Sequence, residues 1–244
     1  MLGSIPFGLI LVRLAGGGDI RQIGSGNIGA TNVLRSGSRA LAAATLVLDA
    51  AKGAIPVILA NSYLTQDFAV VAGAGALLGH MLPVWLKLGS PRQAAQALAM
   101  IAYLVVVGGL LLVGKGMVTP IAILLFLTVP LIAWGGKGVA TGFGVLLALD
   151  PVVGGLACLI WVAVAAVLRY SSLAALAAFH AAVVSAFVLS TYEIGGGYLS
   201  DPQRVEFAVF VTVVITLRHL GNIRRLVRGG EPRIGAAKAT ATGA

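Results

Sequence analysis

The chain has 244 residues, of which 59% are hydrophobic and only 10% are charged, and its mean hydropathy is +1.00. Soluble domains contain about 25% charged residues, so this composition excludes a soluble globule and predicts a single integral membrane domain over 1–244. The formal net charge of +9 raises nucleic-acid binding as an alternative. We disfavour it because six of the seventeen basic residues gather near the C-terminus beside an apolar segment, a pattern typical of an orientation signal and of contact with anionic lipid.

Apolar segments recur along the whole chain. A transmembrane helix needs about 20 mainly apolar residues, although about 17 can suffice. Helices of this length are expected at 41–60, 68–86, 94–113, 117–134, 151–168, 172–190 and 204–220. Two shorter apolar segments, 1–15 and 139–149, are expected to be short or broken helices, which in membranes often line cavities. The predicted fold is therefore an all-α polytopic membrane protein, a helical bundle, with no signal peptide because the first residues lack a basic region.

The basic residues predict the orientation of these helices. If the basic tail, 221–244, is cytoplasmic and each long segment crosses once, then all Lys and Arg except Lys52, Lys115 and Arg204 lie in or beside cytoplasmic loops. This distribution follows the positive-inside rule. The polar connections at 16–40, 87–93, 135–138 and 169–171 then share one face of the membrane, as a single active site requires.

Three residues inside the apolar segments have special chemistry. Asp49 and Lys52 are three positions apart, which places them on one face of a helix. They form either a self-neutralising pair or part of an ion or proton pathway, and we favour the pair. Cys158 is the only cysteine, so it has no disulfide partner in the chain and is expected to be a small buried hydrophobe. No residue cluster predicts a metal site, and no cofactor is expected.

Three polar motifs are expected to meet on the cytoplasmic face. The first is Ser-Gly-Asn-Ile-Gly-Ala-Thr-Asn-Val-Leu-Arg at 25–35, where glycines free backbone N–H groups and the side chains add hydrogen-bond donors suited to an anion. The second combines Gly-His-Met-Leu-Pro-Val-Trp at 79–85 with Gly-Gly-Lys-Gly-Val-Ala-Thr-Gly at 135–142. The third joins Arg-Tyr-Ser-Ser-Leu at 169–173 to Arg-His-Leu-Gly-Asn-Ile at 218–223.

With these motifs in this order, the chain resembles the bacterial acyl-phosphate:glycerol-3-phosphate acyltransferase family (PlsY). The resemblance begins at Gly-Ser-Ile-Pro-Phe-Gly, residues 3–8, and covers about 1–87 and 135–235. It implies a multi-pass enzyme of the bacterial cytoplasmic (inner) membrane, with its active site and C-terminus facing the cytoplasm. The implied reaction transfers a fatty acyl group from acyl phosphate to the sn-1 hydroxyl of glycerol 3-phosphate, giving lysophosphatidic acid and phosphate in phospholipid biosynthesis. The bundle then has seven family-type segments plus an inserted apolar two-helix hairpin at about 88–134.

The implied reaction requires a site that holds two phosphate groups close together. Arg35 can bind a phosphate through two parallel hydrogen bonds, and Lys137 offers a point charge on a glycine-rich backbone. The catalytic residues expected are His80, Ser25 and Lys137, with His80 as the base and a bound phosphate as the alternative base. The residues expected to bind substrate phosphate are Arg35, Lys137, Ser25, Asn27, Gly29, Thr31, Asn32, Gly136, Gly138, Ser172 and Asn222. His180 and His219 are assigned no catalytic role.

Two other classes of protein remain as alternatives. A transporter of a phosphorylated metabolite would use the same loops, but it needs polar groups along a path through the membrane, and only Asp49 and Lys52 supply charge at that depth. An inactive lipid-binding relative is the second alternative, because the hairpin at 88–134 interrupts the family pattern.

Overall fold

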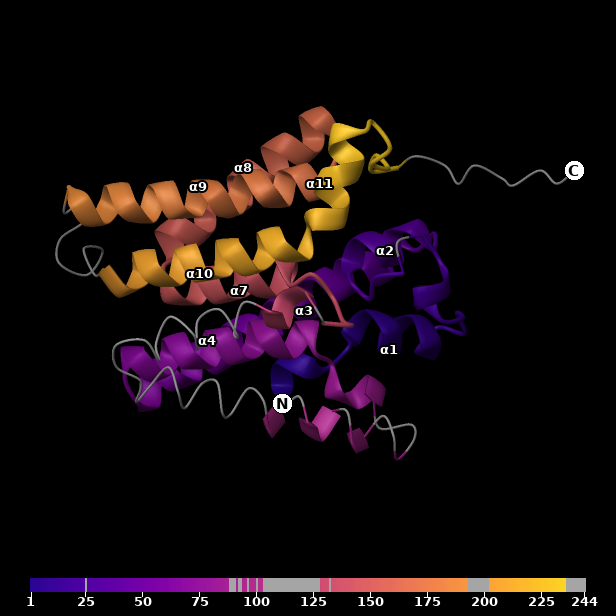
Figure 1. Ribbon diagram of the computed structural model, residues 1–244, viewed down its shortest axis with the longest axis horizontal. Coiled ribbons are helices and arrows are strands. Elements are labelled where there is room, and N and C mark those ends of the chain that lie inside the picture. Colours follow the sequence, from indigo (N-terminus) through magenta and orange to yellow (C-terminus); the bar gives the residue numbers. More distant parts are fainter. Residues whose placement is uncertain are drawn as a thin grey trace, which may run out of the picture.

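The computed structural model describes residues 1–24, 26–87, 91, 94–95, 97–99, 101–102, 128–131, 133–192 and 202–235, and this part of the chain is helical without any strand. The helices are α1 (Phe7–Leu14), α2 (Ala30–Arg35), α3 (Arg39–Tyr63), α4 (Gln66–Met81), α7 (Val139–Leu149), α8 (Pro151–Leu168), α9 (Ser171–Thr191), α10 (Pro202–Arg218) and α11 (Leu220–Val227). Short 3-10 turns occupy Leu2–Ser4, Ile20–Gln22 and Val84–Lys87. The long helices run side by side, and α1, α2 and α11 gather at one end of the bundle (Figure 1).

The described helices include several that are long and apolar enough to span a membrane. Four qualify: α3, α4 with its continuation to Leu86, α8 and α9. Helices α10 and α11 qualify together as a pair that is bent by 62°. The helices predicted at 41–60, 68–86, 151–168, 172–190 and 204–220 are therefore confirmed. The segments predicted at 94–113 and 117–134, and the hairpin at 88–134, lie mostly outside the described residues.

Helix α7 is short, as the sequence predicted, and the reason lies at its C-terminal end. The Asp150 carboxylate accepts hydrogen bonds from the backbone N–H groups of Val152 and Val153, so Asp150 is the N-cap of α8. Pro151 fixes the first position of that helix, where its missing N–H costs nothing. The chain therefore ends α7 at Leu149 and turns directly into α8.

Small residues let α7 pack against α3 at backbone distance. A Cβ on Gly53 of α3 would collide with the backbone carbonyl of Thr141, and a Cβ on Gly144 of α7 would collide with that of Ala50. Close helix approach through glycine is the usual way of packing helices in a membrane. On the other side of α7, Phe143 stacks on Phe179 with ring centroids 4.9 Å apart. Helix α7 is thus held in the interior of the bundle.

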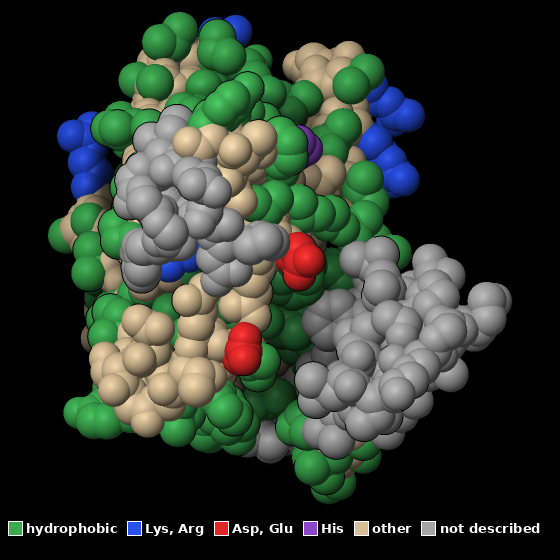
Figure 2. Space-filling view, turned by 90° about the vertical axis from the view of Figure 1, so that its left-hand side faces the viewer, with side chains coloured by type: hydrophobic (Ala, Val, Ile, Leu, Met, Phe, Trp, Pro, Cys, Tyr) green, Lys and Arg blue, Asp and Glu red, His purple; other side chains and the backbone are tan. Residues whose placement is uncertain are grey.

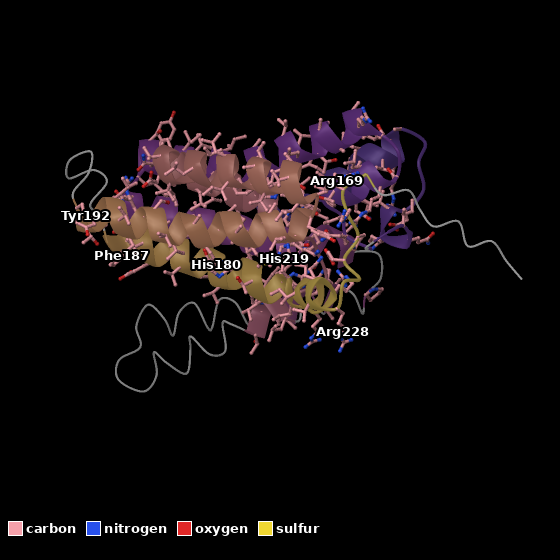
Figure 3. All side chains as sticks on the ribbon, turned by 90° about the horizontal axis from the view of Figure 1, so that it is seen from above. Arg169, His180, Phe187, Tyr192, His219 and Arg228 are labelled. Atoms are coloured by element: carbon pink, nitrogen blue, oxygen red, sulfur yellow. The ribbon has the colours of Figure 1, made fainter. Side chains whose placement is uncertain are left out.

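The two ends of the bundle differ in charge. Arg169 and Arg228 lie at one end, whereas Phe187 and Tyr192 lie at the other (Figure 3). At this second end Gln203 donates a hydrogen bond to Asp67, and Arg204 lies 3.3 Å from Asp150. Figure 2 shows the surface of this second end. Acidic side chains lie near the middle of the view, and most visible basic side chains lie at its edges. Asp67, Asp150 and Arg204 thus share one end, as the predicted threading requires.

The polar connection at 16–40 is more ordered than a plain loop. It contains the 3-10 turn Ile20–Gln22 and helix α2, whose N-cap is Gly29. Asp19 caps the turn and forms ion pairs with Arg13 and Arg21. The hydrogen bond from the Arg21 side chain holds the pKa of Asp19 well below its usual value, although burial opposes this shift. The connection therefore places the second half of the 25–35 motif on a short helix.

Candidate active site

A cavity of about 630 Å³ lies at the end of the bundle that carries the polar connections. Its walls come from α2, α3, α7, α8, α9 and α11, from the end of α4, and from residues near 137 and 231. The predicted site residues that line it are Asn27, Gly29, Thr31, Asn32, Arg35, His80, Lys137, Gly138, Ser172 and Asn222. Gly136 lies directly behind this wall, against His80. Ser25, predicted to be catalytic, is outside the described residues.

The Gly-Gly-Lys-Gly segment is bound directly to the end of α4. The N–H of Gly135 donates to the carbonyl of Met81 at 2.7 Å, and that of Gly136 donates to the carbonyl of His80 at 3.2 Å. Gly138 has φ +83, a left-handed conformation that glycine adopts readily, and it begins α7. His80 and the loop that carries Lys137 are therefore neighbours, although 57 positions separate them in the sequence.

One arginine fixes the shape of this glycine loop. The Arg218 guanidinium donates hydrogen bonds of 2.7–3.2 Å to four backbone carbonyls, those of Pro130, Ala133, Gly135 and Gly136. Only a planar guanidinium presents so many donors in a fixed arrangement. The sequence placed Arg218 in the third motif but did not predict this bracing role, because loop carbonyls leave no mark in the sequence.

His80 lies beneath the glycine loop and is buried, with 3% of its surface exposed. A Cβ on Gly136 would lie 2.6 Å from Cδ2 and 2.7 Å from Cε1 of the His80 ring, and closer still to Nε2. Real Cβ contacts are essentially never shorter than 3.0 Å. The loop can therefore cover the imidazole only because position 136 is a glycine.

Lys137 belongs to a chain of hydrogen bonds that crosses the cavity wall. Its Nζ donates to Oδ1 of Asn222 at 2.7 Å, and Nδ2 of Asn222 donates to Oε1 of Glu231 at 2.6 Å. The same carboxylate oxygen accepts a 2.7 Å hydrogen bond from Ser172, and Oε2 accepts a 2.8 Å hydrogen bond from Arg225. Three predicted phosphate-binding side chains, Lys137, Ser172 and Asn222, are thus tied together through Glu231.

This network sets the protonation of its members. Burial lowers the pKa of Lys137 to about 8, and the cations Arg225, Arg35 and Arg218 act in the same direction, while Glu231 opposes them. Burial raises the pKa of Glu231, but the hydrogen bonds from Asn222, Ser172 and Arg225 outweigh this and lower it overall. Glu231 is therefore an anion at neutral pH, whereas the charge of Lys137 changes near pH 8.

Glu231 was not predicted from the sequence, and it lies in the segment predicted as a basic cytoplasmic tail. Residues 220–235 are in fact folded: α11 is followed by an irregular segment in which the Ile234 N–H donates to the carbonyl of Arg169 at 2.6 Å. A single acidic residue after two glycines in an otherwise basic stretch was the available signal.

The asparagines of the 25–35 motif shape the motif itself. Nδ2 of Asn32 donates to the carbonyls of Ile20 at 2.7 Å and Asn27 at 2.8 Å, so both of its amide hydrogens are engaged. Oδ1 of Asn27 accepts a hydrogen bond from the N–H of Gly29 at 3.1 Å. Thr31 and Arg35, one helical turn apart on α2, both line the cavity.

The remainder of the cavity is apolar and reaches the outer surface of the bundle. Leu46 and Val47 of α3 and Val162 of α8 line it, yet they are 44%, 64% and 57% exposed. On a membrane-spanning bundle such exposed apolar side chains face lipid. Cys158 and Trp161 line the same part, so Cys158 borders a groove rather than lying in a closed core. In the described part of the chain, no three His, Cys, Asp or Glu side chains are placed to hold a metal ion.

The fold and the site together define an integral membrane helical protein whose cavity joins a cationic, hydrogen-bonding end to a lipid-facing apolar groove. A family model described as glycerol-3-phosphate acyltransferase matches residues 1–134 and 126–229. A relative from Jannaschia sp., named glycerol-3-phosphate acyltransferase, is 42% identical over 235 residues, covering 96% of this chain and 89% of the relative. A relative of the same name from Paramagnetospirillum magneticum is 44% identical over 242 residues, covering 98% of this chain and 92% of the relative.

Solved structures of PlsY, an integral membrane glycerol 3-phosphate acyltransferase, are also similar. Its glycerol 3-phosphate form and its lysophosphatidic acid form each give a TM-score of 0.68 at 30% sequence identity, covering 96% of this chain and 90% of PlsY. The chain belongs to the glycerol-3-phosphate acyltransferase family, and it is an acyltransferase. The resemblance derived from its motifs is confirmed.

Proposed function

We propose that this protein transfers a fatty acyl group from acyl phosphate to the sn-1 hydroxyl of glycerol 3-phosphate, giving lysophosphatidic acid and phosphate. The observation that carries the proposal is the composition of the cavity. Arg35 and Lys137 stand at its polar end, and an apolar groove open to lipid begins beside them. A small phosphate ester and a long-chain acyl donor need these two environments next to each other. The similar PlsY structures, in glycerol 3-phosphate and lysophosphatidic acid forms, support the choice of substrate and product.

In this proposal the polar end binds the phosphates of both substrates. Arg35 and Lys137 supply the charge, and hydroxyl, amide and backbone N–H groups supply neutral hydrogen bonds. The other residues proposed to contact phosphate are Ser25, Asn27, Gly29, Thr31, Gly136, Gly138, Ser172 and Asn222, whereas Asn32, whose amide hydrogens are bonded to the carbonyls of Ile20 and Asn27, supports the loop. Asn222 is held in position by Glu231 before any substrate binds and keeps a second amide hydrogen for phosphate, so less ordering remains for binding. The Ser172 hydroxyl, which donates to Glu231, has to turn toward the phosphate.

The acyl transfer needs one bond to form and one to break. The sn-1 oxygen attacks the acyl carbon, and the bond between that carbon and the phosphate oxygen breaks, with phosphate leaving with the electron pair. His80 is the proposed acceptor of the hydroxyl proton, with a bound phosphate as the alternative acceptor, and Lys137 stabilises the negative charge that develops. Acyl phosphate is already activated, so a covalent acyl-enzyme is not required.

We further propose that the site faces the cytoplasm of a bacterial inner membrane. Arg169, Arg218, Arg225 and Arg228 lie at or near the end that carries the cavity, which suits the cytoplasmic side. The basic residues of the tail are then in reach of anionic lipid head groups. The chain is proposed to be a single membrane domain with an accessory hairpin at about 88–134.

The test is acyl transfer by the purified protein in lipid nanodiscs, supplied with palmitoyl phosphate and radiolabelled glycerol 3-phosphate. We expect labelled lysophosphatidic acid, no product from Arg35→Ala or Lys137→Ala, and normal product from Arg13→Ala, a half-exposed arginine paired with Asp19. A folded wild-type protein without product would refute the proposal in favour of an inactive relative. Uptake of glycerol 3-phosphate into sealed vesicles without acylation would refute it in favour of a transporter.

A further inference from the structure

Two groups of charged side chains have no part in the proposed reaction. Asp49 and Lys52 of α3 form the first: their Oδ1 and Nζ atoms lie 2.6 Å apart, as the self-neutralising pair that the sequence favoured. The second group is the row of exposed arginines on α11. Exposed basic residues at the end of a membrane-spanning bundle are suited to an anionic partner outside the chain.

Helix α11 lies across the end of the bundle. It is bent by 62° from α10, which runs alongside the other long helices (Figure 1). Helix α11 packs against α9 and buries the side chain of Asn222. A helix that turns by this angle at the end of a membrane bundle lies close to the plane of the membrane surface, where the lipid head groups are.

The outer side of α11 has the composition of an interfacial helix. Arg224, Arg225 and Arg228 are exposed and lie within four positions of one another, on one side of the helix. Leu220 and Val227 are seven positions apart, which places them together on the neighbouring side, and they are 37% and 83% exposed. A basic side next to an exposed apolar side is typical of helices that rest on an anionic membrane surface.

The positive charge of α11 exceeds what the folded chain neutralises. Among the described residues, Glu231 is the carboxylate that contacts this basic side, and it accepts a 2.8 Å hydrogen bond from Nε of Arg225. Both of its oxygens are already hydrogen-bonded. Within the part of the chain that the structure describes, the side chains of Arg224 and Arg228 have no hydrogen bond or ion pair. An anion from outside the chain therefore complements the charge of α11.

We infer that α11 is an anchor for anionic phospholipid head groups of the cytoplasmic leaflet, and that a bound head group supports the phosphate-binding site through Arg225. The second half rests on the proposed function, because it concerns affinity for glycerol 3-phosphate. Arg224, Arg225 and Arg228 donate to the lipid phosphate. Leu220 and Val227 enter the boundary of the acyl chains.

Arg225 connects the membrane surface to the cavity. Its side chain is 46% exposed, whereas that of Glu231 is 3% exposed. Its Nε–H is bonded to Glu231, which leaves the Nη hydrogens of the same guanidinium for a lipid phosphate. Glu231 is bonded to Asn222, and Asn222 is bonded to Lys137. A bound head group that fixes Arg225 therefore orders the carboxylate that positions two of the proposed phosphate ligands.

Lipid binding is tested without turnover, by native mass spectrometry of the protein in detergent titrated with phosphatidylglycerol or with zwitterionic phosphatidylcholine. We expect the wild type to bind phosphatidylglycerol more tightly. Each basic residue near an anionic lipid strengthens the contact about fivefold, so Arg224→Gln with Arg228→Gln should weaken it about 25-fold and leave phosphatidylcholine binding unchanged.

The matched control is Arg13→Gln with Arg21→Gln. It removes the same number of charges from two half-exposed arginines that pair with Asp19, and it should bind phosphatidylglycerol as the wild type does. Equal binding by the two double variants, whether retained or lost, would overturn the inference, because α11 would then have no special part in the affinity.

The link to the site is tested by kcat and KM for glycerol 3-phosphate in nanodiscs. In phosphatidylcholine alone, the wild type and the variant Arg224→Gln with Arg228→Gln should have equal values. Added phosphatidylglycerol should lower the KM of the wild type about threefold relative to this variant, the effect of ordering one side chain. Repulsion between the anionic membrane and glycerol 3-phosphate acts on both proteins and cancels in this ratio.

A KM ratio that phosphatidylglycerol leaves unchanged would overturn the link through Arg225. If phosphatidylglycerol binds as expected but the wild type transfers no acyl group, the lipid anchor stands and the proposed function fails.

Discussion

Replacing Gly136 by alanine tests the contact between the glycine loop and His80. The added Cβ would stand 2.6 Å from Cδ2 of His80, whereas ordinary contacts are 3.4–4 Å, so the ring or the loop has to move by about 0.8 Å or more. Neither moves freely, because the ring is buried and the Gly136 N–H is bonded to the His80 carbonyl. Overpacking of this kind costs about 1–3 kcal/mol of stability. A misplacement near 1 Å can reduce the rate about 100-fold.

The assay is kcat and KM for glycerol 3-phosphate in nanodiscs, with thermal unfolding measured in parallel. The control is Gly155→Ala in α8, where a new Cβ meets no atom within 4 Å. Alanine is favoured over glycine inside a helix by about 0.5–1 kcal/mol, so the control should be as stable as wild type or more so, and fully active. A Gly136→Ala protein with wild-type kcat and KM would refute the described packing of the loop on His80.

Three further predictions concern charge, the groove and the bracing of the loop. Because the pKa of Lys137 is lowered to about 8, its ammonium form is lost as the pH rises through 8, and affinity for glycerol 3-phosphate should fall about fivefold between pH 8 and 9. Calorimetry checks this, and flat affinity over that range, as expected for Lys137→Arg, would contradict it. Cys158, which lines the apolar part of the cavity, should be protected from N-ethylmaleimide by palmitoyl phosphate but not by glycerol 3-phosphate; equal labelling would exclude acyl binding there. Lysine at position 218 cannot maintain the four carbonyl contacts. Arg218→Lys should therefore lower the free energy of unfolding by about 2 kcal/mol and raise KM for glycerol 3-phosphate. The control, Arg228→Lys at an exposed position, should change neither. Equal unfolding temperatures for these two variants would argue against the bracing role.

Much of the fold followed from the sequence because the membrane restricts the possibilities. The helix at 139–149 was predicted with its final bounds, since the Asp150–Pro151 pair both ends one helix and begins the next. The clustering of the polar motifs at one end followed from the distribution of basic residues. His80 and Lys137, 57 residues apart, meet because the backbone of Gly135 and Gly136 is hydrogen-bonded to the carbonyls of Met81 and His80.

The internal bracing of the site was not predictable in the same way. Glu231 and Arg218 act by bonding side chains and backbone carbonyls that are remote in the sequence, and no local pattern reports such partners. The amide of Asn32 was predicted to bind phosphate, but its hydrogens are bonded to the carbonyls of Ile20 and Asn27. At this position the polar side chain therefore supports the loop.

Calorimetric binding of glycerol 3-phosphate to the purified protein in nanodiscs, without an acyl donor, tests the central claim most directly. Arg35 and Lys137, from distant parts of the chain, line one cavity and are proposed to bind phosphate there together. We expect one binding site in the wild type and in Arg13→Ala, and no measurable binding in Arg35→Ala or in Lys137→Ala. Wild-type affinity in the last two variants would contradict it.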